Sequence, residues 1–201
     1  MQIDLERLKS TLLELAKIGF NDADKGVYRP GFSAADMTAR RWLMKLMADE
    51  GFATHMDGAG NVYGRLGDAK RPSVTLGLHL DTVPAGGMFD GALGVIAGLE
   101  VLRVCRDQKL ALNWPIEVVA TSEEEGRYGG MLGAQAIAGD LTPGQILSMH
   151  DADNNLLADA MTAAGLEPLG ALDAHRLPES MRAFLELHVE QGPVLDNTGT
   201  T

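Results

Sequence analysis

Apolar residues recur at three- and four-residue intervals in several stretches of the chain, a spacing that is typical of amphipathic helices. The second of these stretches begins with Ser33 and has Asp36 three residues later, which indicates a helix N-terminus closed by a capping side chain. We therefore expect helices over residues 3–18, 33–51, 91–106, 130–138 and 155–164.

Shorter apolar runs without the helical spacing indicate strands. The runs over residues 73–80 and 116–121 are nearly continuous, as in strands covered on both faces, and the helix between them implies a parallel pair. Residues 52–56 and 62–66 flank a turn-forming segment and predict a hairpin. Residues 184–189 alternate apolar and polar side chains, as a half-buried strand does. The order of the elements predicts one α/β domain.

Charge and hydropathy narrow the choice of partners. The 201 residues carry a formal net charge of −11, and without a basic stretch we expect no nucleic-acid partner. No run approaches the roughly 20 apolar residues of a membrane span, and the first residues lack the features of a secretion signal. We therefore expect no membrane partner and a cytoplasmic protein. Residues 196–201 are turn-like with no closing helix, which gives the expectation of an interrupted chain.

Polar side chains gather where the expected buried strands end, which is where open α/β sheets bind ligands. His79 ends one such strand, and the carboxylate of Asp81, two residues later, is placed to accept its free ring N–H. Asp90 follows in a flexible loop, although an aspartate before a helix is also an ordinary N-cap. His188 lies on the polar face of the last expected strand, where a structural histidine is the default interpretation.

Three consecutive carboxylates, Glu123, Glu124 and Glu125, follow the other buried strand. Acidic runs are usually solvated surface, but at a strand end their repulsion is best offset by a cation. Two imidazoles together with several carboxylates suit a pair of Zn, Mn or Co ions. Such a centre polarises a carbonyl and activates water, while a nearby glutamate that is not a ligand moves the proton. The pattern predicts hydrolysis of an amide-type C–N bond.

Four segments make the pattern recognisable: GLHLDTVP (residues 77–84), GMFDGALGV (87–95), TSEEEGRYGGML (121–132) and ELHVEQGP (186–193). In their order and spelling they resemble the hydantoinase/carbamoylase amidases within the M20 metallopeptidase-like hydrolases. That group includes N-carbamoyl-L-amino-acid hydrolases, allantoate amidohydrolases and bacterial β-ureidopropionases. The resemblance covers nearly the whole chain.

The resemblance implies a role for each polar residue at the strand ends. Glu124 would be the general base, Asp81 would orient His79, and Gln191 would lie on the substrate side. Asp90 would bridge two divalent ions, which would be zinc or else manganese, cobalt or nickel. The implied metal ligands are His79, Asp90, Glu125 and His188.

The acidic motif departs from the family pattern, in which a small residue separates the glycine from the arginine. Here Gly126 is followed directly by Arg127, so the alignment of the glutamates is open by one position. Anchoring on the glycine makes Glu124 the base and Glu125 a ligand, whereas anchoring on the arginine shifts both roles to Glu123 and Glu124. We prefer the first alignment, because there the glycine directly follows the ligand.

The resemblance also implies a fold, and it implies that the sequence covers only part of the family's catalytic domain. We expect a zinc-exopeptidase-like three-layer α/β sandwich with a mostly parallel mixed sheet, truncated before the lid and dimerisation domain. Residues 1–201 would be the N-terminal part of the catalytic domain. The family's lid and its last catalytic segment, which brings a final histidine ligand, are not in this sequence. Full-length members are commonly homodimeric.

The expected substrates are small carbamoyl or ureido compounds, such as N-carbamoyl-L-amino acids, allantoate or ureidopropionate. One alternative is another M20 hydrolase, an aminoacylase or a dipeptidase. A second alternative, of a different class, is a catalytically silent fragment that binds one metal ion, because only one of the two sites is nearly complete in this chain.

Overall fold

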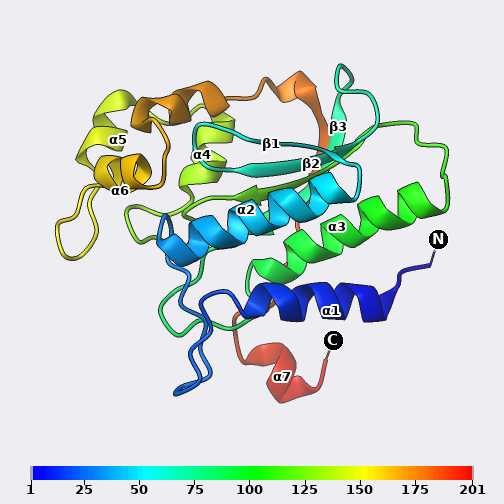
Figure 1. Ribbon diagram of the computed structural model, residues 1–201, viewed down its shortest axis with the longest axis horizontal. Coiled ribbons are helices and arrows are strands. Elements are labelled where there is room, and N and C mark those ends of the chain that lie inside the picture. Colours follow the sequence, from blue (N-terminus) through cyan, green and yellow to red (C-terminus); the bar gives the residue numbers. More distant parts are fainter. Residues whose placement is uncertain (1, 201) are drawn as a thin grey trace.

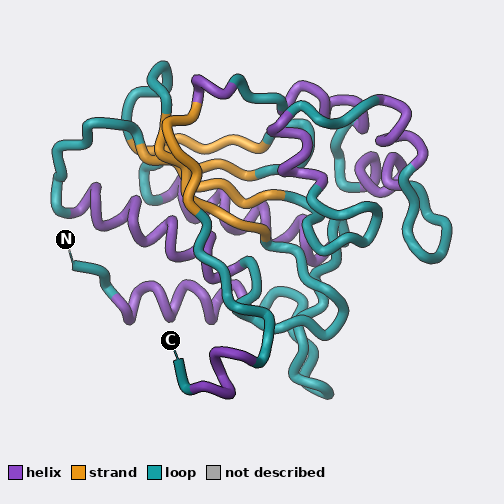
Figure 2. Tube along the Cα trace, turned by 180° about the vertical axis from the view of Figure 1, so that it is seen from behind, coloured by secondary structure: helices purple, strands orange, loops and turns teal. Residues whose placement is uncertain are grey.

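The structure is a computed structural model that describes residues 2–200. Its centre is a five-stranded mixed sheet with the strand order β1-β2-β4-β3-β5, and helices lie on both faces of this sheet (Figures 1 and 2). The three-layer α/β fold expected from the sequence is therefore confirmed. The strands are β1 (Ala53–Met56), β2 (Val62–Leu66), β3 (Ser73–His79), β4 (Ile116–Thr121) and β5 (Met181–Leu185).

Strand pairing brings the ends of the two most buried strands together. β3 and β4 are parallel, and their register pairs His79 with Thr121, so both strands end at the same edge of the sheet. β5 also runs parallel to β3, on its other side. β1 and β2 form the expected hairpin, and β2 is antiparallel to β4. Two of the four pairings are thus parallel.

The N-terminal helices cover one face of the sheet (Figure 1). They are α1 (Leu5–Ala16), α2 (Ala34–Asp49) and α3 (Ala92–Asp107). Their fully buried apolar side chains, among them Leu43, Met47 and Leu99, pack with Val118 of β4 in the main core. Ser33 is the N-cap of α2, and its hydroxyl accepts the N–H of Asp36 at 3.2 Å, which confirms the capping signal in the sequence.

Short elements after β4 cover the other face and build a second core (Figure 1). Buried Leu132, Ile146, Leu157 and Met161 meet in this core. Two of the helices were expected, but residues 143–148 were not assigned a helix. These elements are α4 (Leu132–Ala138), α5 (Pro143–Ser148), α6 (Leu157–Ala163) and the 3-10 helices η1 (Pro168–Ala174) and η2 (Pro178–Ser180).

The C-terminal region differs from two expectations. The strand expected over residues 184–189 is wrong in position, because β5 ends at Leu185 and His188 lies beyond it. β5 is an edge strand whose residues are mostly exposed, so the alternation of side chains does not mark its limits. The expectation of no closing helix is also wrong. α7 (Val194–Thr198) forms after Glu190, whose carboxylate accepts the first N–H groups of the helix.

Among residues 2–200, no helix combines the length and the hydropathy needed to cross a lipid bilayer.

Candidate metal centre

His79 is held at the end of β3 with one ring nitrogen left free. The side chain is fully buried, and its Nδ1 lies 2.9 Å from the main-chain carbonyl of Asp81. The Asp81 carboxylate is farther from this nitrogen, at 3.9 Å, so the main-chain oxygen of Asp81 makes the closer contact that we had expected from its side chain. The opposite nitrogen, Nε2, is buried without a hydrogen-bond partner among the described residues.

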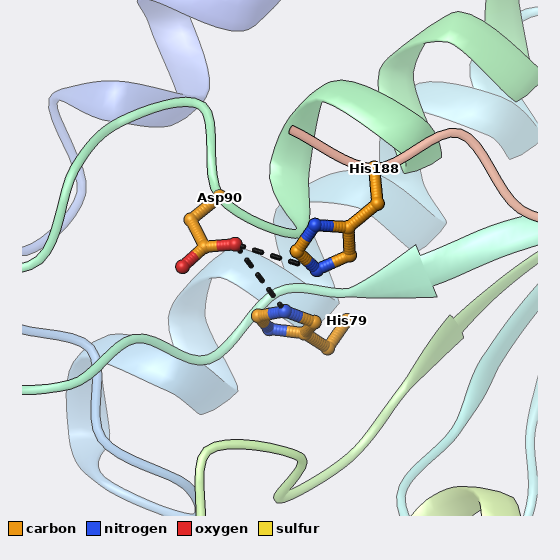
Figure 3. Close-up of side chains that lie close together, drawn as sticks. All are labelled: His79, Asp90 and His188. Carbon is orange, nitrogen blue, oxygen red and sulfur yellow. Dashed lines mark ion pairs between the residues drawn. The ribbon is translucent and has the colours of Figure 1, made fainter. Parts of the chain in front are cut away.

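Three segments, of which the one with His188 is distant in sequence, meet around that free nitrogen (Figure 3). Asp90 lies in the loop before α3, and its Oδ1 is 3.9 Å from His79 Nε2. His188 follows β5, and its Nε2 is 3.6 Å from the same Asp90 oxygen. The donor atoms of these three residues lie within 4.8 Å of one another, which is close enough to hold a metal ion. Asp90 does not cap α3, because Gly91 occupies the N-cap position.

A second group of potential ligands shares His79. Glu124 Oε2 lies 3.6 Å from His79 Nε2, and Glu125 completes a set whose donor atoms also lie within 4.8 Å of one another. The resemblance implied that Asp90 is the shared ligand, whereas the shared residue of the two groups in residues 2–200 is His79. The Asp81 carboxylate links the strand end to the glutamates, since its Oδ2 accepts the N–H of Glu125 at 3.0 Å.

The buried polar atoms at this place fit a divalent cation. His79 Nε2, Asp81 Oδ1 and Asp90 Oδ1 are all buried without a hydrogen-bond partner in the described part of the chain. An unsatisfied buried polar atom costs about 1–3 kcal/mol, so three in one place need an explanation. A cation held between an imidazole nitrogen and carboxylate oxygens satisfies two of them, and this mixture of donors suits zinc and similar ions.

Glu123 has a separate task from its two neighbours. It is fully buried, and its carboxylate accepts the N–H groups of Tyr128 at 2.6 Å and Gly130 at 3.1 Å. Burial raises the pKa of Glu123 to about 7. It belongs to neither ligand group. This geometry favours the alignment in which Glu124 and Glu125 face the centre and Glu123 closes the following loop.

Burial is also the main cause that raises the pKa of Glu125. The nearby carboxylates of Asp90 and Glu124 raise this pKa further, while His79 acts in the opposite direction. A carboxyl group in this position is costly to ionise alone, and a bound cation would offset the cost.

Sequence reasoning missed a buried ion pair beside the centre. Arg40 of α2 pairs with Asp36 at 2.9 Å, and neither side chain reaches solvent. Arg40 also donates to the carbonyls of Ala120 and Thr121 at the end of β4 and lies 3.7 Å from the Asp81 carboxylate. Burial raises the pKa of Asp36, although Arg40 counteracts it. The signal was present in the sequence, because Asp36 and Arg40 fall on the apolar face of the expected helix.

Gln191 lies beside the first ligand group. Its side-chain amide donates to Asp90 Oδ2, the carboxylate oxygen that does not face the histidines. The structure therefore brings together every residue that the resemblance singled out: His79, Asp81, Asp90, Glu124, Glu125, His188 and Gln191.

A mixed α/β sheet that presents a histidine and carboxylates at the carboxyl ends of its parallel strands is an arrangement that suits a class of metal-dependent enzymes. Comparison with known proteins gives the family. The sequence model of peptidase family M28 matches residues 61–194. The chain belongs to this family.

Curated relatives and solved structures carry names from the group that the sequence resembles. The chain is 41% identical over 200 residues to an N-carbamoyl-L-amino acid amidohydrolase of Geobacillus stearothermophilus, covering 96% of this chain and 48% of that protein. It is 36% identical to allantoate deiminase 2 of Glycine max, covering 98% and 42%. A hydantoinase/carbamoylase family amidase from Burkholderia ambifaria superposes with a TM-score of 0.85 at 36% identity, covering 98% and 48%.

These matches confirm the resemblance to the hydantoinase/carbamoylase amidases. The chain spans about half the length of the curated relatives it matches. The matching family model is described as peptidase family M28, whereas the four sequence segments resemble amidases within the M20 hydrolases.

Proposed function

We propose that the chain belongs to a metal-dependent hydrolase of linear, non-peptide C–N bonds, with N-carbamoyl-L-amino acids or related ureido compounds such as allantoate as substrates. The observation that carries this proposal is that potential ligand atoms of His79, Asp90 and His188 lie within 4.8 Å of one another. Two of these atoms, His79 Nε2 and Asp90 Oδ1, are buried without a hydrogen-bond partner in the described chain. The names of the relatives support the substrate class.

In this proposal His79, Asp90 and His188 hold one divalent ion, and Glu125 contributes to a second. The bound ions would polarise the scissile carbonyl and lower the pKa of a water molecule. The nature of the metal, zinc or else manganese, cobalt or nickel, is part of the proposal. His79, Asp90 and His188 would supply three protein ligands to the first ion, the usual number in a catalytic site.

The chain's own residues have distinct tasks. Glu124 is the general base that accepts a proton from water and delivers it to the leaving nitrogen, because its carboxylate is partly exposed and lies 3.6 Å from His79 Nε2. Asp81 positions both His79, through its carbonyl, and the glutamate loop, through its carboxylate. Gln191 fixes the orientation of Asp90 and is itself exposed to solvent.

Metal content per purified chain, measured by elemental analysis, tests the centre. At least one divalent ion per chain is expected in the parent protein, and the His79→Ala and His188→Ala variants should lose it. His55→Ala and His175→Ala are matched controls, because these exposed histidines belong to neither ligand group. A folded parent chain that binds no divalent ion would remove the basis of the proposal.

Ammonia release from N-carbamoyl amino acids and allantoate, measured with the metal-loaded chain, tests the reaction. Turnover that disappears in Glu124→Gln while the ion is retained is the expected result. Hydrolysis of N-acetyl amino acids or dipeptides instead would indicate an aminoacylase or dipeptidase. A chain that binds metal but turns over none of these compounds would be the silent metal-binding alternative.

A further inference from the structure

A polar cavity lies at the opposite end of the sheet from the candidate metal centre. Residues 65–72, which lead from β2 into β3, form one side of it, and residues 176–180 form the other. These two segments lie side by side at the top of Figures 1 and 2. The cavity holds about 270 Å³. Since β3 begins at Ser73 and ends at His79, on the order of 20 Å separates it from the metal centre at roughly 3.3 Å per residue.

The cavity is basic in a chain that is otherwise acidic. Arg65, Lys70, Arg71 and Arg176 line it, with Glu179 as its acidic lining residue, although the whole chain has a formal net charge of −11. Neither Lys70 nor Arg71 forms an ion pair within the described residues, since the ion pairs of this cavity involve Arg65 and Arg176. We refer to it as the basic cavity.

One buried carboxylate is paired with two of the four cations. Glu117 is 3.0 Å from Arg65, and its other oxygen is paired with Arg176. The same carboxylate accepts the hydroxyl of Ser73, so its capacity as an acceptor is largely used. The basic cavity therefore keeps an excess of positive charge.

The loop that carries Lys70 and Arg71 is already folded around Arg65. The Arg65 guanidinium donates to the carbonyls of Asp68 and Arg71, and the Asp68 carboxylate accepts the N–H of Lys70 at 2.9 Å. The Arg71 guanidinium packs over Trp114 at 5.2 Å from the ring centre. A ligand that binds here meets a preorganised loop, which lowers the entropy cost of binding.

Two polar atoms of the basic cavity's lining residues are buried with no partner in the described part of the structure. They are Arg65 Nε and Ser180 Oγ. Both groups carry hydrogen-bond donors. A buried donor without an acceptor costs about 1–3 kcal/mol, so the lining residues of the basic cavity have more donors than acceptors.

We propose that the basic cavity binds a small phosphate-bearing anion. Arginine forks match the oxygens of phosphate, and charge-assisted hydrogen bonds of this kind are among the strongest in proteins. The volume is several times the roughly 30 Å³ that one water molecule occupies in the liquid. Inorganic phosphate and the phosphate group of a small monoester therefore both fit. This proposal does not depend on the proposed hydrolase activity.

Calorimetric titration of the chelator-treated chain with inorganic phosphate and with glycerol 3-phosphate tests the proposal, in sodium chloride of constant ionic strength. Chelation is needed because phosphate would also bind metal ions at the candidate centre. At least one of the two anions should bind with a Kd of about 1 mM or below. Tighter binding of the monoester would identify a phosphorylated metabolite as the ligand, and equal binding would identify free phosphate.

A charge-matched pair of variants separates a specific site from general electrostatics. In the Lys70→Ala/Arg71→Ala double variant we expect Kd to rise at least about tenfold. The Lys25→Ala/Lys45→Ala double variant removes the same charge from two exposed ion pairs elsewhere and should bind as the parent does. Phosphate should also raise the melting temperature of the parent and of the control, but not of the cavity variant.

Equal weakening in both double variants would overturn the proposal, because it would reveal only long-range attraction. Absence of binding heat for both anions would overturn it too, and water would then be the partner of the two buried donors. If the double variant fails to fold, the single Lys70→Glu variant takes its place, since this side chain is exposed and makes no ion pair in the described residues.

Discussion

Arg40 and Asp36 form an ion pair that is closed to solvent, next to the strand ends that carry the candidate ligands. Transfer of two ions out of water costs free energy, but hydrogen bonds to their remaining donors and acceptors offset this cost. Arg40 meets this condition through the carbonyls of Gly60, Ala120 and Thr121. Its role is to fix the end of β4, from which the glutamate loop departs.

Removal of Arg40 should therefore be far more damaging than removal of an exposed charge. Arg40→Met leaves Asp36 and Asp81 without their cation, and we expect a loss of about 3–5 kcal/mol in the free energy of unfolding, measured by urea denaturation. Lys45→Ala, which breaks an exposed pair in the same helix, should change it by less than about 1 kcal/mol. A small effect for Arg40 would mean that the fold tolerates the unpaired carboxylates.

The sequence predicted the histidines and carboxylates of the centre but not their exact contacts. His79, Asp90 and Glu125 could be singled out because a strand end followed by polar residues is a recognisable pattern. The shared position of His79 could not, because it depends on side-chain directions that only the folded sheet defines. The same holds for Glu123, whose partners are N–H groups of a loop rather than a metal ion.

At the scale of whole elements, the N-cap of α2 offers a simple measure of helix stabilisation. Ser33→Ala removes the acceptor for the N–H of Asp36, and this should cost about 1 kcal/mol in urea denaturation. Ser10→Ala, at an exposed position inside α1, is the matched control and should leave stability nearly unchanged. Equal losses in the two variants would show that the cap contributes nothing of its own.

The segment after β5 should lose more protection from hydrogen exchange on metal removal than any other segment of the chain. Residues 186–192 are mostly exposed, and His188 connects them to Asp90 and His79. Chelation should therefore speed hydrogen exchange of this segment while leaving β4 protected. If the free concentration of the ion is about 100 times its Kd, removal of the ion lowers the free energy of unfolding of the chain by about 2.7 kcal/mol.

Hydrogen-exchange mass spectrometry with and without chelator makes this measurement. His188→Ala provides the control, since its exchange should already be fast and should not respond to the chelator. Exchange in 186–192 that ignores metal in the parent chain would contradict the prediction.

Long periodic elements were predicted well, and short exposed ones were not. α1, α2, α3, β3 and β4 begin and end within a few residues of the expected positions, because each buries a continuous apolar face that fixes its periodicity. β5 and α7 expose most of their side chains, so no burial pattern records their limits. α5 was not predicted, because six residues are too few for a helical period to be recognised.

At the scale of the molecule, several exposed apolar side chains lie close together in the sequence near its C-terminal end. Phe184, Leu185 and Leu187 lie on or after the edge strand, and Val194 and Leu195 follow in α7, all with more than a third of their surface exposed. An open strand edge beside exposed apolar groups favours association between molecules.

We therefore expect concentration-dependent self-association of the chain in sedimentation velocity. Leu185→Lys and Leu187→Lys together should shift the chain toward monomer, because they place charge beside the open edge. Leu5→Lys, at an apolar position in α1 that is even more exposed, should not. A parent chain that stays monomeric at all concentrations would show that this surface is not adhesive.

The placement of His188 beyond the edge strand has a consequence for the order of folding. Of the first ligand group, His79 and Asp90 are eleven residues apart, whereas His188 comes from a segment that must first join the sheet beside β3. Contacts of such wide sequence separation form late, because closing a long loop costs entropy before any contact repays it. An ion that needs all three donors can be captured only after β5 has docked. Metal uptake would then report the final step of folding. Binding of the ion would begin only when β5 has docked, and the ion would be held tightly once all three donors are in place.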